Sequence, residues 1–116
     1  MFIEVLKSKL AHATITEAEL FYEGSITVDE NLMKAANLLP HEKVDVLNLN
    51  NGSRIQTYVI KGKAGSGQVC LNGPAARCGL VGDRIIILSY AMVDQSKAES
   101  FVPTIVLLDH DNKIKS

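Results

Sequence analysis

The sequence has no tryptophan, only two cysteines and three histidines, and neither a long apolar run nor a block of basic residues. Cys70 and Cys78 lack the Cys-x-x-Cys spacing, and His12, His41 and His110 are scattered, which argues against a metal site. Without a basic stripe, nucleic acids and anionic membranes are poor candidates for partners. No run is long enough to span a bilayer and no signal-peptide pattern is present, so we expect a cytoplasmic protein.

What the sequence does contain is typical of one globular domain. The chain has 116 residues, of which 47% are hydrophobic and 22% charged, and its net charge is −1. This length supports a single core, so we treat residues 1–116 as a single domain.

The dominant pattern is that of short β-strands. Segments rich in Val, Ile, Thr and Tyr, several of them alternating, predict strands at 2–10, 25–28, 44–49, 54–60, 68–72, 83–91 and 103–108. Asp29 can cap a helix over 30–37, a capping box predicts one helical turn at 16–19, and another turn is expected at 96–100. The fold class is therefore mainly β, with a few short helices, and a small closed barrel is expected.

Glycine marks the expected turns. Asn51-Gly52 between two strand segments predicts a type I′ hairpin turn, in which both residues have positive φ. The glycine-rich segment 62–67 predicts a loop that joins a second hairpin. Phosphate binding is the alternative for that loop, but no helix follows it.

The pair Gly24-Ser25 can carry unusual chemistry. A serine hydroxyl can attack the preceding carbonyl, and glycine leaves that carbonyl uncrowded. The resulting ester can eliminate and hydrolyse to a pyruvoyl group, an electron sink made from the chain itself. The dipeptide alone proves little, because Gly52-Ser53 and Gly65-Ser66 suit ordinary turns.

Several motifs occur together, and the sequence from Met1 to about Asp109 resembles the pyruvoyl-dependent aspartate 1-decarboxylase family. The segments that carry the resemblance are Lys7-Ser8-Lys9, Ala13-Thr14-Ile15-Thr16, Tyr22-Glu23-Gly24-Ser25-Ile26-Thr27-Val28-Asp29, Asn50-Asn51-Gly52-Ser53-Arg54, Thr57-Tyr58, Asn72-Gly73-Pro74-Ala75-Ala76-Arg77 and Val81-Gly82-Asp83. They follow the family's order and spacing. Each segment is weak alone, and together they are specific.

The resemblance implies a double-psi β-barrel that cleaves itself between Gly24 and Ser25. The pieces would be a β chain, 1–24, and an α chain, 25–116, which begins with a pyruvoyl cofactor made from Ser25. The implied reaction converts L-aspartate to β-alanine and CO2 through a Schiff base, for pantothenate and coenzyme A synthesis. The implied assembly is a homotetramer with active sites between subunits.

The same resemblance assigns roles to individual residues. Tyr58 would return a proton to the substrate carbon, although by itself it suits a strand tyrosine with its hydroxyl at the rim. Because aspartate brings two carboxylates, we expect Arg54 to clamp one of them and Lys9 to steer the other, from its own chain or from a neighbouring subunit. Thr57 would either hydrogen-bond the Gly24 carbonyl during cleavage or contact substrate. The alternative for these residues is an ordinary place on a strand.

A second group would surround the reacting centre. Asn72 and the amides near Gly73 and Ala75 could hold developing negative charge, although locally Asn72-Gly73 suits a turn. Pro74 belongs to this substrate-binding segment but has no N–H, so any contact through that amide is lost. Tyr22 could pack against substrate or only support the turn.

One further departure concerns the family's usual histidine. Its place is taken by Ala11, and the neighbouring histidine is His12. A one-residue shift in a strand turns a side chain to the opposite face, so we expect His12 to be a surface or packing residue.

Two alternatives stay open at this point. One is a non-enzymatic β-barrel that serves as a binding or assembly module, since such folds host many functions. The other is a pyruvoyl decarboxylase that acts on a different acidic amino acid.

Overall fold

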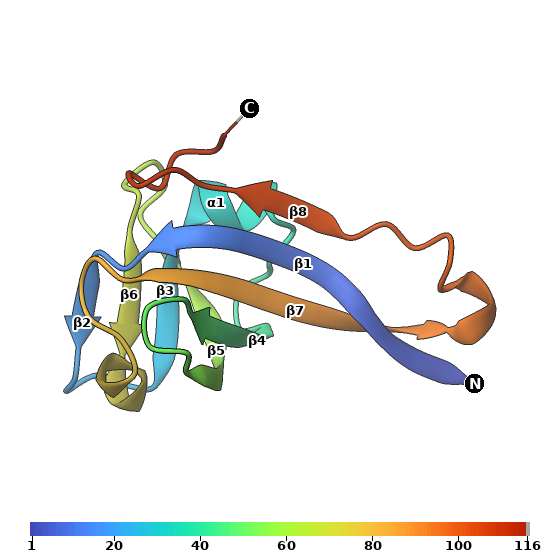
Figure 1. Ribbon diagram of the computed structural model, residues 1–116, viewed down its shortest axis with the longest axis horizontal. Helices are drawn as coiled ribbons and strands as arrows, with labels where there is room; N and C mark the ends of the chain where they lie inside the picture. The colour runs from blue at the N-terminus through green and yellow to red at the C-terminus, as the bar shows by residue number, and fades with distance from the viewer. Residues whose placement is uncertain (116) are drawn as a thin grey trace.

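The computed structural model describes residues 1–115, and most of them lie in strands (Figure 1). The strands and helices are β1 Phe2–Thr14, β2 Glu17–Glu19, β3 Ser25–Asp29, α1 Glu30–Ala35, β4 Lys43–Asn48, β5 Arg54–Gly62, β6 Val69–Asn72, the 3-10 helix η1 Gly73–Arg77, β7 Arg84–Asp94, the 3-10 helix η2 Gln95–Lys97, and β8 Thr104–Leu107. All seven predicted strand segments contain a strand. The prediction of a mainly β domain with short helices is confirmed.

The strands follow the spatial order β2-β6-β3-β5-β4-β7-β1-β8. Three of the pairings are parallel, namely β2 with β6, β3 with β5 and β1 with β8, and the others are antiparallel. Parallel pairing needs crossover connections, so segments far apart in the chain meet in this sheet. In particular, β3 lies between β5 and β6, which brings residue 25 beside residue 72.

The core is made of aliphatic side chains from nearly every strand and from α1. The largest fully buried members are Leu10, Ile15, Ile26, Met33, Leu71, Ile85, Ile87, Leu108, Val28, Val44, Val59 and Val69. Burial of this apolar area is the main force that holds the strands together. No helix in residues 1–115 is long and apolar enough to cross a membrane.

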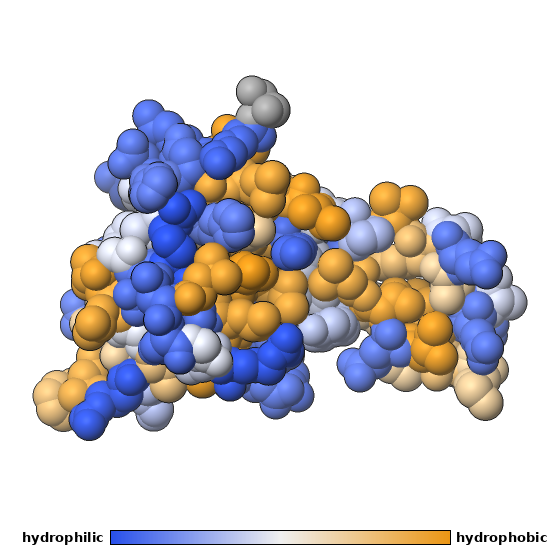
Figure 2. Space-filling model, in the orientation of Figure 1, coloured by the Kyte–Doolittle hydropathy of each residue, from blue (hydrophilic) through white to orange (hydrophobic). Residues whose placement is uncertain are grey.

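The β1–β7 arm, which pairs residues 2–6 with residues 90–94, projects from the rest of the molecule (Figure 1). Its apolar side chains are unusually exposed: Met1 is 88% exposed, Phe2 66% and Met92 62%. Val102, in the segment between η2 and β8, is 82% exposed. Figure 2 shows hydrophobic surface both on the arm and over the body of the molecule.

The predicted helical turn at 16–19 is wrong, because Glu17–Glu19 forms β2 and pairs with β6. The Thr16 hydroxyl does not cap a helix. It donates to the Val69 carbonyl at 3.0 Å and accepts from the Val69 amide at 2.9 Å. This double contact fixes the chain beside β6, and tertiary pairing overrides the local capping pattern.

The Asn51-Gly52 segment does join two antiparallel strands, β4 and β5, but not through a type I′ turn. Only Gly52 has positive φ, at +76°, whereas a type I′ turn needs it at Asn51 as well. The connection is a longer loop, in which Asn48 Oδ1 accepts hydrogen bonds from the backbone amides of Asn50 and Asn51 at 2.7 and 3.2 Å. These side-chain hydrogen bonds hold the loop in place of the backbone contacts of a tight turn.

The glycine-rich segment 62–67 is not the loop of a hairpin, because its flanking strands, β5 and β6, are separated by β3. The Asp29 carboxylate holds this loop by accepting the amides of Gly65 and Gly67 at 3.0 and 2.8 Å, and it also caps α1 through Asn31 at 2.8 Å. Burial raises the pKa of Asp29, but hydrogen bonds from the amides of Gly67, Gly65, Asn31 and Leu32 outweigh burial and lower it. The carboxylate therefore remains ionised.

His12 is exposed, as expected for a surface residue. A register shift in β1 lies between Ala11 and Ala13, where His12 adopts a φ of +67°. Both flanking alanines are buried, so the chain keeps them inward and the imidazole outward.

Candidate functional site

Ser25 is the first residue of β3, and it is fully buried even though the preceding segment, 20–23, is exposed. Its Oγ lies 3.4 Å from the Glu23 carbonyl, to which it donates, and it accepts a hydrogen bond from Asn72 Nδ2 at 2.9 Å. The hydroxyl is therefore held beside the Gly24-Ser25 peptide, away from bulk water.

Asn72 is the centre of a buried polar cluster. It lies opposite Ser25 in the pairing of β6 with β3, and its side chain also donates from Nδ2 to Thr27 Oγ1 at 2.8 Å. Its Oδ1 accepts from Cys70 Sγ at 3.2 Å. Burial, and then the carboxylates of Glu17 and Glu19, raise the pKa of the Cys70 thiol to about 11. The thiol is therefore protonated at neutral pH and can donate.

The local backbone conformation requires glycine at position 73. Its φ is +63°, and a Cβ placed on it would lie 2.6 Å from the Tyr22 carbonyl oxygen and 3.0 Å from both Gly24 N and Cα. The close approach packs η1 directly against the segment that contains the predicted cleavage point. Only glycine allows both the positive φ and this contact.

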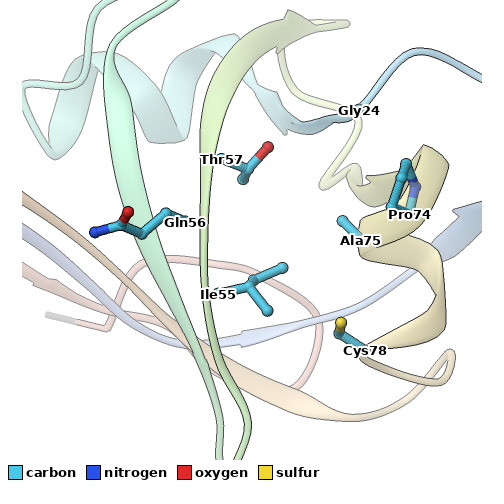
Figure 3. A pocket seen from close by; sticks show the side chains of 7 residues that line it. All are labelled: Gly24, Ile55, Gln56, Thr57, Pro74, Ala75 and Cys78. Atoms are coloured by element: carbon cyan, nitrogen blue, oxygen red, sulfur yellow. The ribbon is translucent and has the colours of Figure 1, made fainter.

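A pocket of about 310 Å³ opens next to Gly24. Its lining residues are Gly24, Ile55, Gln56, Thr57, Pro74, Ala75 and Cys78. Figure 3 shows the side chains of Ile55 and Thr57 pointing from β5 toward Pro74 and Ala75 on η1, whereas the Gln56 side chain points the other way. The structure thus brings Thr57, Pro74 and Ala75 to the Gly24 end of the predicted cleavage point, whereas Asn72 lines a separate hollow.

The predicted cationic residues lie elsewhere, on what we call the outer face of the sheet. Side chains directly opposite each other on paired strands share a face, and two adjacent rows define this one: Arg54, Leu47 and Ile86, then Asp45, Leu88 and Lys9. Successive side chains of a strand alternate, so Arg54 points away from the pocket that Ile55 and Thr57 line. The Ser25 cluster lies on this same side of the sheet, further along β5, because Thr27 shares a face of β3 with Ser25 and is paired with Ile60.

Arg54 is accessible on the outer face. Its side chain is 54% exposed, and Nη1 lies 2.7 Å from Asp45 Oδ2. The Tyr90 hydroxyl and the Asp45 carboxylate raise the pKa of the guanidinium, which stays charged. Asp45 is largely buried, but the exposed guanidinium end of the pair leaves further N–H donors open to a second carboxylate.

The two predicted tyrosines also lie outside the pocket. By strand alternation, Tyr58 shares the side of β5 that carries Arg54, and it is paired with Lys43. Its ring lies 6.3 Å from that of His41. Tyr22 is 57% exposed and lines a separate hollow, together with Thr27 and Asn72. The prediction that Thr57 and Tyr58 face opposite sides of the strand agrees with this register.

Sequence reasoning missed Cys70 and Thr27 as members of the site. It considered Cys70 only as a possible metal ligand, and the structure has both Cys70 and Cys78 as free thiols. The spacing of Cys70 and Asn72, two residues apart in a strand, places them on one face. Their proximity to Thr27 depends on the pairing of β6 with β3, which local patterns do not reveal.

Comparison with known proteins places this arrangement in a family. Residues 1–115 match the family model described as aspartate decarboxylase. An aspartate 1-decarboxylase of Caldicellulosiruptor bescii is 58% identical over 114 residues, which span 98% of this chain and 89% of the relative. One from Dehalococcoides mccartyi is 56% identical over 95% of this chain and 89% of its own length. One from Parabacteroides distasonis is 58% identical over 94% of each chain.

The fold has a structural counterpart as well. A crystal structure of a rationally designed double-psi β-barrel protein matches with a TM-score of 0.50 and 16% identity, covering 66% of this chain and 90% of the designed one. The predicted double-psi β-barrel is confirmed, and so is the resemblance to pyruvoyl-dependent aspartate 1-decarboxylases at the level of the family. From its sequence over nearly its whole length, the chain belongs to the aspartate decarboxylase family.

Proposed function

We propose that this chain cleaves itself between Gly24 and Ser25 and then decarboxylates L-aspartate at C1 to β-alanine and CO2, supplying β-alanine for pantothenate. Family membership supports the decarboxylation of aspartate. The observation that carries the rest is the fully buried Ser25 hydroxyl, held by Asn72 at 2.9 Å next to an uncrowded glycine carbonyl and an open pocket.

Cleavage uses only groups of the chain and one water molecule. Ser25 Oγ bonds to the Gly24 carbonyl carbon, the C–N bond breaks, and the hydroxyl proton ends on the Ser25 nitrogen, which gives an ester. Elimination then releases the Gly24 carboxylate and leaves dehydroalanine, and water converts this to a ketone and ammonia. The Asn72 N–H stabilises negative charge that develops on Oγ in the first step.

The residues around Ser25 fit the implied pyruvoyl group. Elimination removes Ser25 Oγ with Gly24 and puts the ketone oxygen in place of the Ser25 nitrogen, so the Asn72 Nδ2 donor, which faces Oγ, is left beside the new Gly24 carboxylate, an acceptor. When present, a pyruvoyl group supplies an electrophilic carbonyl that takes up the electrons left by a departing carboxylate. The small side chain of Ala75 and the polar Thr57 leave room for a short amino acid beside it.

Substrate recognition needs cations, and the two candidates lie on the outer face. Arg54 can bind a carboxylate bidentately, and Lys9 provides a second positive charge from the neighbouring row. Because Arg54 points away from the pocket that Gly24 and Thr57 line, we propose that a neighbouring copy supplies the cations to this pocket. A homotetramer with sites between subunits satisfies this requirement, and the exposed apolar arm gives the copies a surface to share.

Tyr58 is our proposed proton donor to the substrate carbon. A phenol is protonated at neutral pH and can deliver its proton over a hydrogen-bond distance. Its position on the same side of β5 as Arg54 supports its use together with the cations rather than as a core residue.

The fate of Ser25 tests the proposal directly. Purified protein, denatured and weighed by mass spectrometry, is expected to give a piece that ends at Gly24 and a remainder that begins with a pyruvoyl group. A single intact chain in an active preparation contradicts the mechanism. Turnover of aspartate compared with glutamate tests the substrate, since glutamate places its distal carboxylate one methylene further away.

A further inference from the structure

The orientation of the Asn72 side chain decides what Ser25 meets. A carboxamide has a donor end and an acceptor end, whereas the hydroxyls of Ser25 and Thr27 can each donate or accept. These two hydroxyls therefore tolerate either orientation of the amide. A third neighbour must fix which end of Asn72 faces Ser25.

Cys70 is that neighbour. Its Sγ lies 3.2 Å from Asn72 Oδ1, it is only 2% exposed, and it shares a face of β6 with Asn72. The register places Thr27 opposite Cys70 and Ser25 opposite Asn72, so the four side chains form one block, in which Thr27 is half-buried and the other three are buried. A thiol that stays protonated can donate only to the oxygen end of the amide.

We propose that Cys70 is a positioning residue for the cleavage at Gly24-Ser25: its S–H holds Asn72 Oδ1 and so directs Nδ2 to Ser25 Oγ. This inference rests on the proposed self-cleavage. As Oγ loses its proton and attacks, negative charge grows on or near it, and a donor there lowers the barrier. The opposite orientation would present the Asn72 oxygen to that charge and would raise the barrier.

Two substitutions isolate the donor. Cys70→Ser and Cys70→Ala both shrink the side chain, but only serine keeps a donor. We expect Cys70→Ala to slow the appearance of the fragment ending at Gly24 by about fivefold to tenfold, the size of one neutral hydrogen bond, and Cys70→Ser to restore the rate. Cys70→Val, a donor-free variant with more volume, covers the case in which alanine fails to fold, and it is also expected to be slow.

Val69→Ala is the matched control for lost packing. Val69 is the preceding residue of β6, is fully buried, and points to the opposite side of the strand. Its substitution is expected to lower the melting temperature and to leave the cleavage rate near that of the unsubstituted chain. A slow Cys70→Ala variant beside a normal Val69→Ala variant of equal or lower stability separates positioning from folding.

The background substitution Asn72→Ala completes the test. If Cys70 acts through Asn72, adding Cys70→Ala to Asn72→Ala produces no further slowing. Equal cleavage rates for Cys70→Ala and Cys70→Ser, or additive effects in the double variant, overturn the inference. Failure of the unsubstituted chain to cleave at all overturns the proposed function instead, so the two failures are distinguishable.

Discussion

Two parts of the candidate site differ in how complete they are within one chain. In the cleavage region, around the Gly24-Ser25 peptide, Ser25 and Asn72 are buried and hydrogen-bonded, and Gly73 packs against the backbone. On the outer face, Arg54 is half exposed and pairs with the Asp45 carboxylate. The cleavage region is preorganised, as a self-cleaving peptide requires, while Arg54 is open to a ligand and to another subunit.

This contrast suggests a division of labour. Groups that break the backbone must be in place in a newly folded chain, so they are expected to come from one chain. Groups that bind aspartate are needed only afterwards and can come from assembly. Substitutions in the cleavage region should therefore affect cleavage, and those of the cationic residues should affect turnover alone.

The largest expected effect is at Ser25. Ser25→Ala removes the nucleophile, so we expect complete loss of both cleavage and decarboxylation while the fold is retained. Denaturing mass spectrometry and CO2 release measure the two losses. Residual cleavage in this variant would show that another group performs the attack.

Gly73→Ala tests whether the cleavage region depends on backbone packing. The added Cβ meets the Tyr22 carbonyl oxygen at 2.6 Å and the φ of +63° is unfavourable, so we expect a loss of roughly 3 kcal/mol in unfolding free energy, together with slow cleavage. Gly82→Ala is the matched control, because Gly82 has a φ of +95° but nothing within 4 Å of the added Cβ. The control should lose only about 1 kcal/mol in denaturant unfolding and should cleave normally.

Arg54→Ala tests the outer face. We expect normal cleavage but a decrease of about 100-fold in kcat/KM for aspartate, because a bidentate carboxylate contact is lost. Lys61→Ala is the control, since it removes an exposed cation further along β5, and its kinetics should be unchanged. Slow cleavage in Arg54→Ala would contradict the proposed division of labour between the cleavage region and the cationic residues.

The smallest effect concerns pH. The Cys70 thiol ionises near pH 8.5 in an unfolded chain and at about 11 in the folded one, so the folded state retains a proton that the unfolded state loses. The stability that this adds is complete below pH 8.5 and declines as pH rises toward 11. Unfolding of the uncleaved Ser25→Ala variant, with and without Cys70→Ser, should show a steeper decline over this range when the thiol is present.

Much of the fold could be predicted from local patterns, because alternating β-branched residues and the Asp29 cap act over a few positions. The errors lie where distant contacts decide the structure. Thr16 suits a helix cap, but its hydroxyl hydrogen-bonds to the Val69 backbone. The glycine-rich loop is held by the Asp29 carboxylate and does not form a hairpin.

The site shows the same division. The Gly24-Ser25 pair and its partners could be named from motifs that resemble a family, and the structure places Thr57, Asn72, Pro74 and Ala75 near them. The role of Cys70 could not be seen, because nothing in the segment 68–72 shows that it will lie against β3. Strand alternation alone puts Arg54 and Thr57 on opposite sides of the predicted strand, but which side faces the core depends on how β5 pairs with β3 and β4.

The first 24 residues contribute a long inner member of the sheet, since β1 pairs with β7 on one edge and with β8 on the other. A nick after residue 24 would therefore release nothing. Both fragments would stay interlaced, and a native molecular weight would hide a processing event that only unfolding reveals.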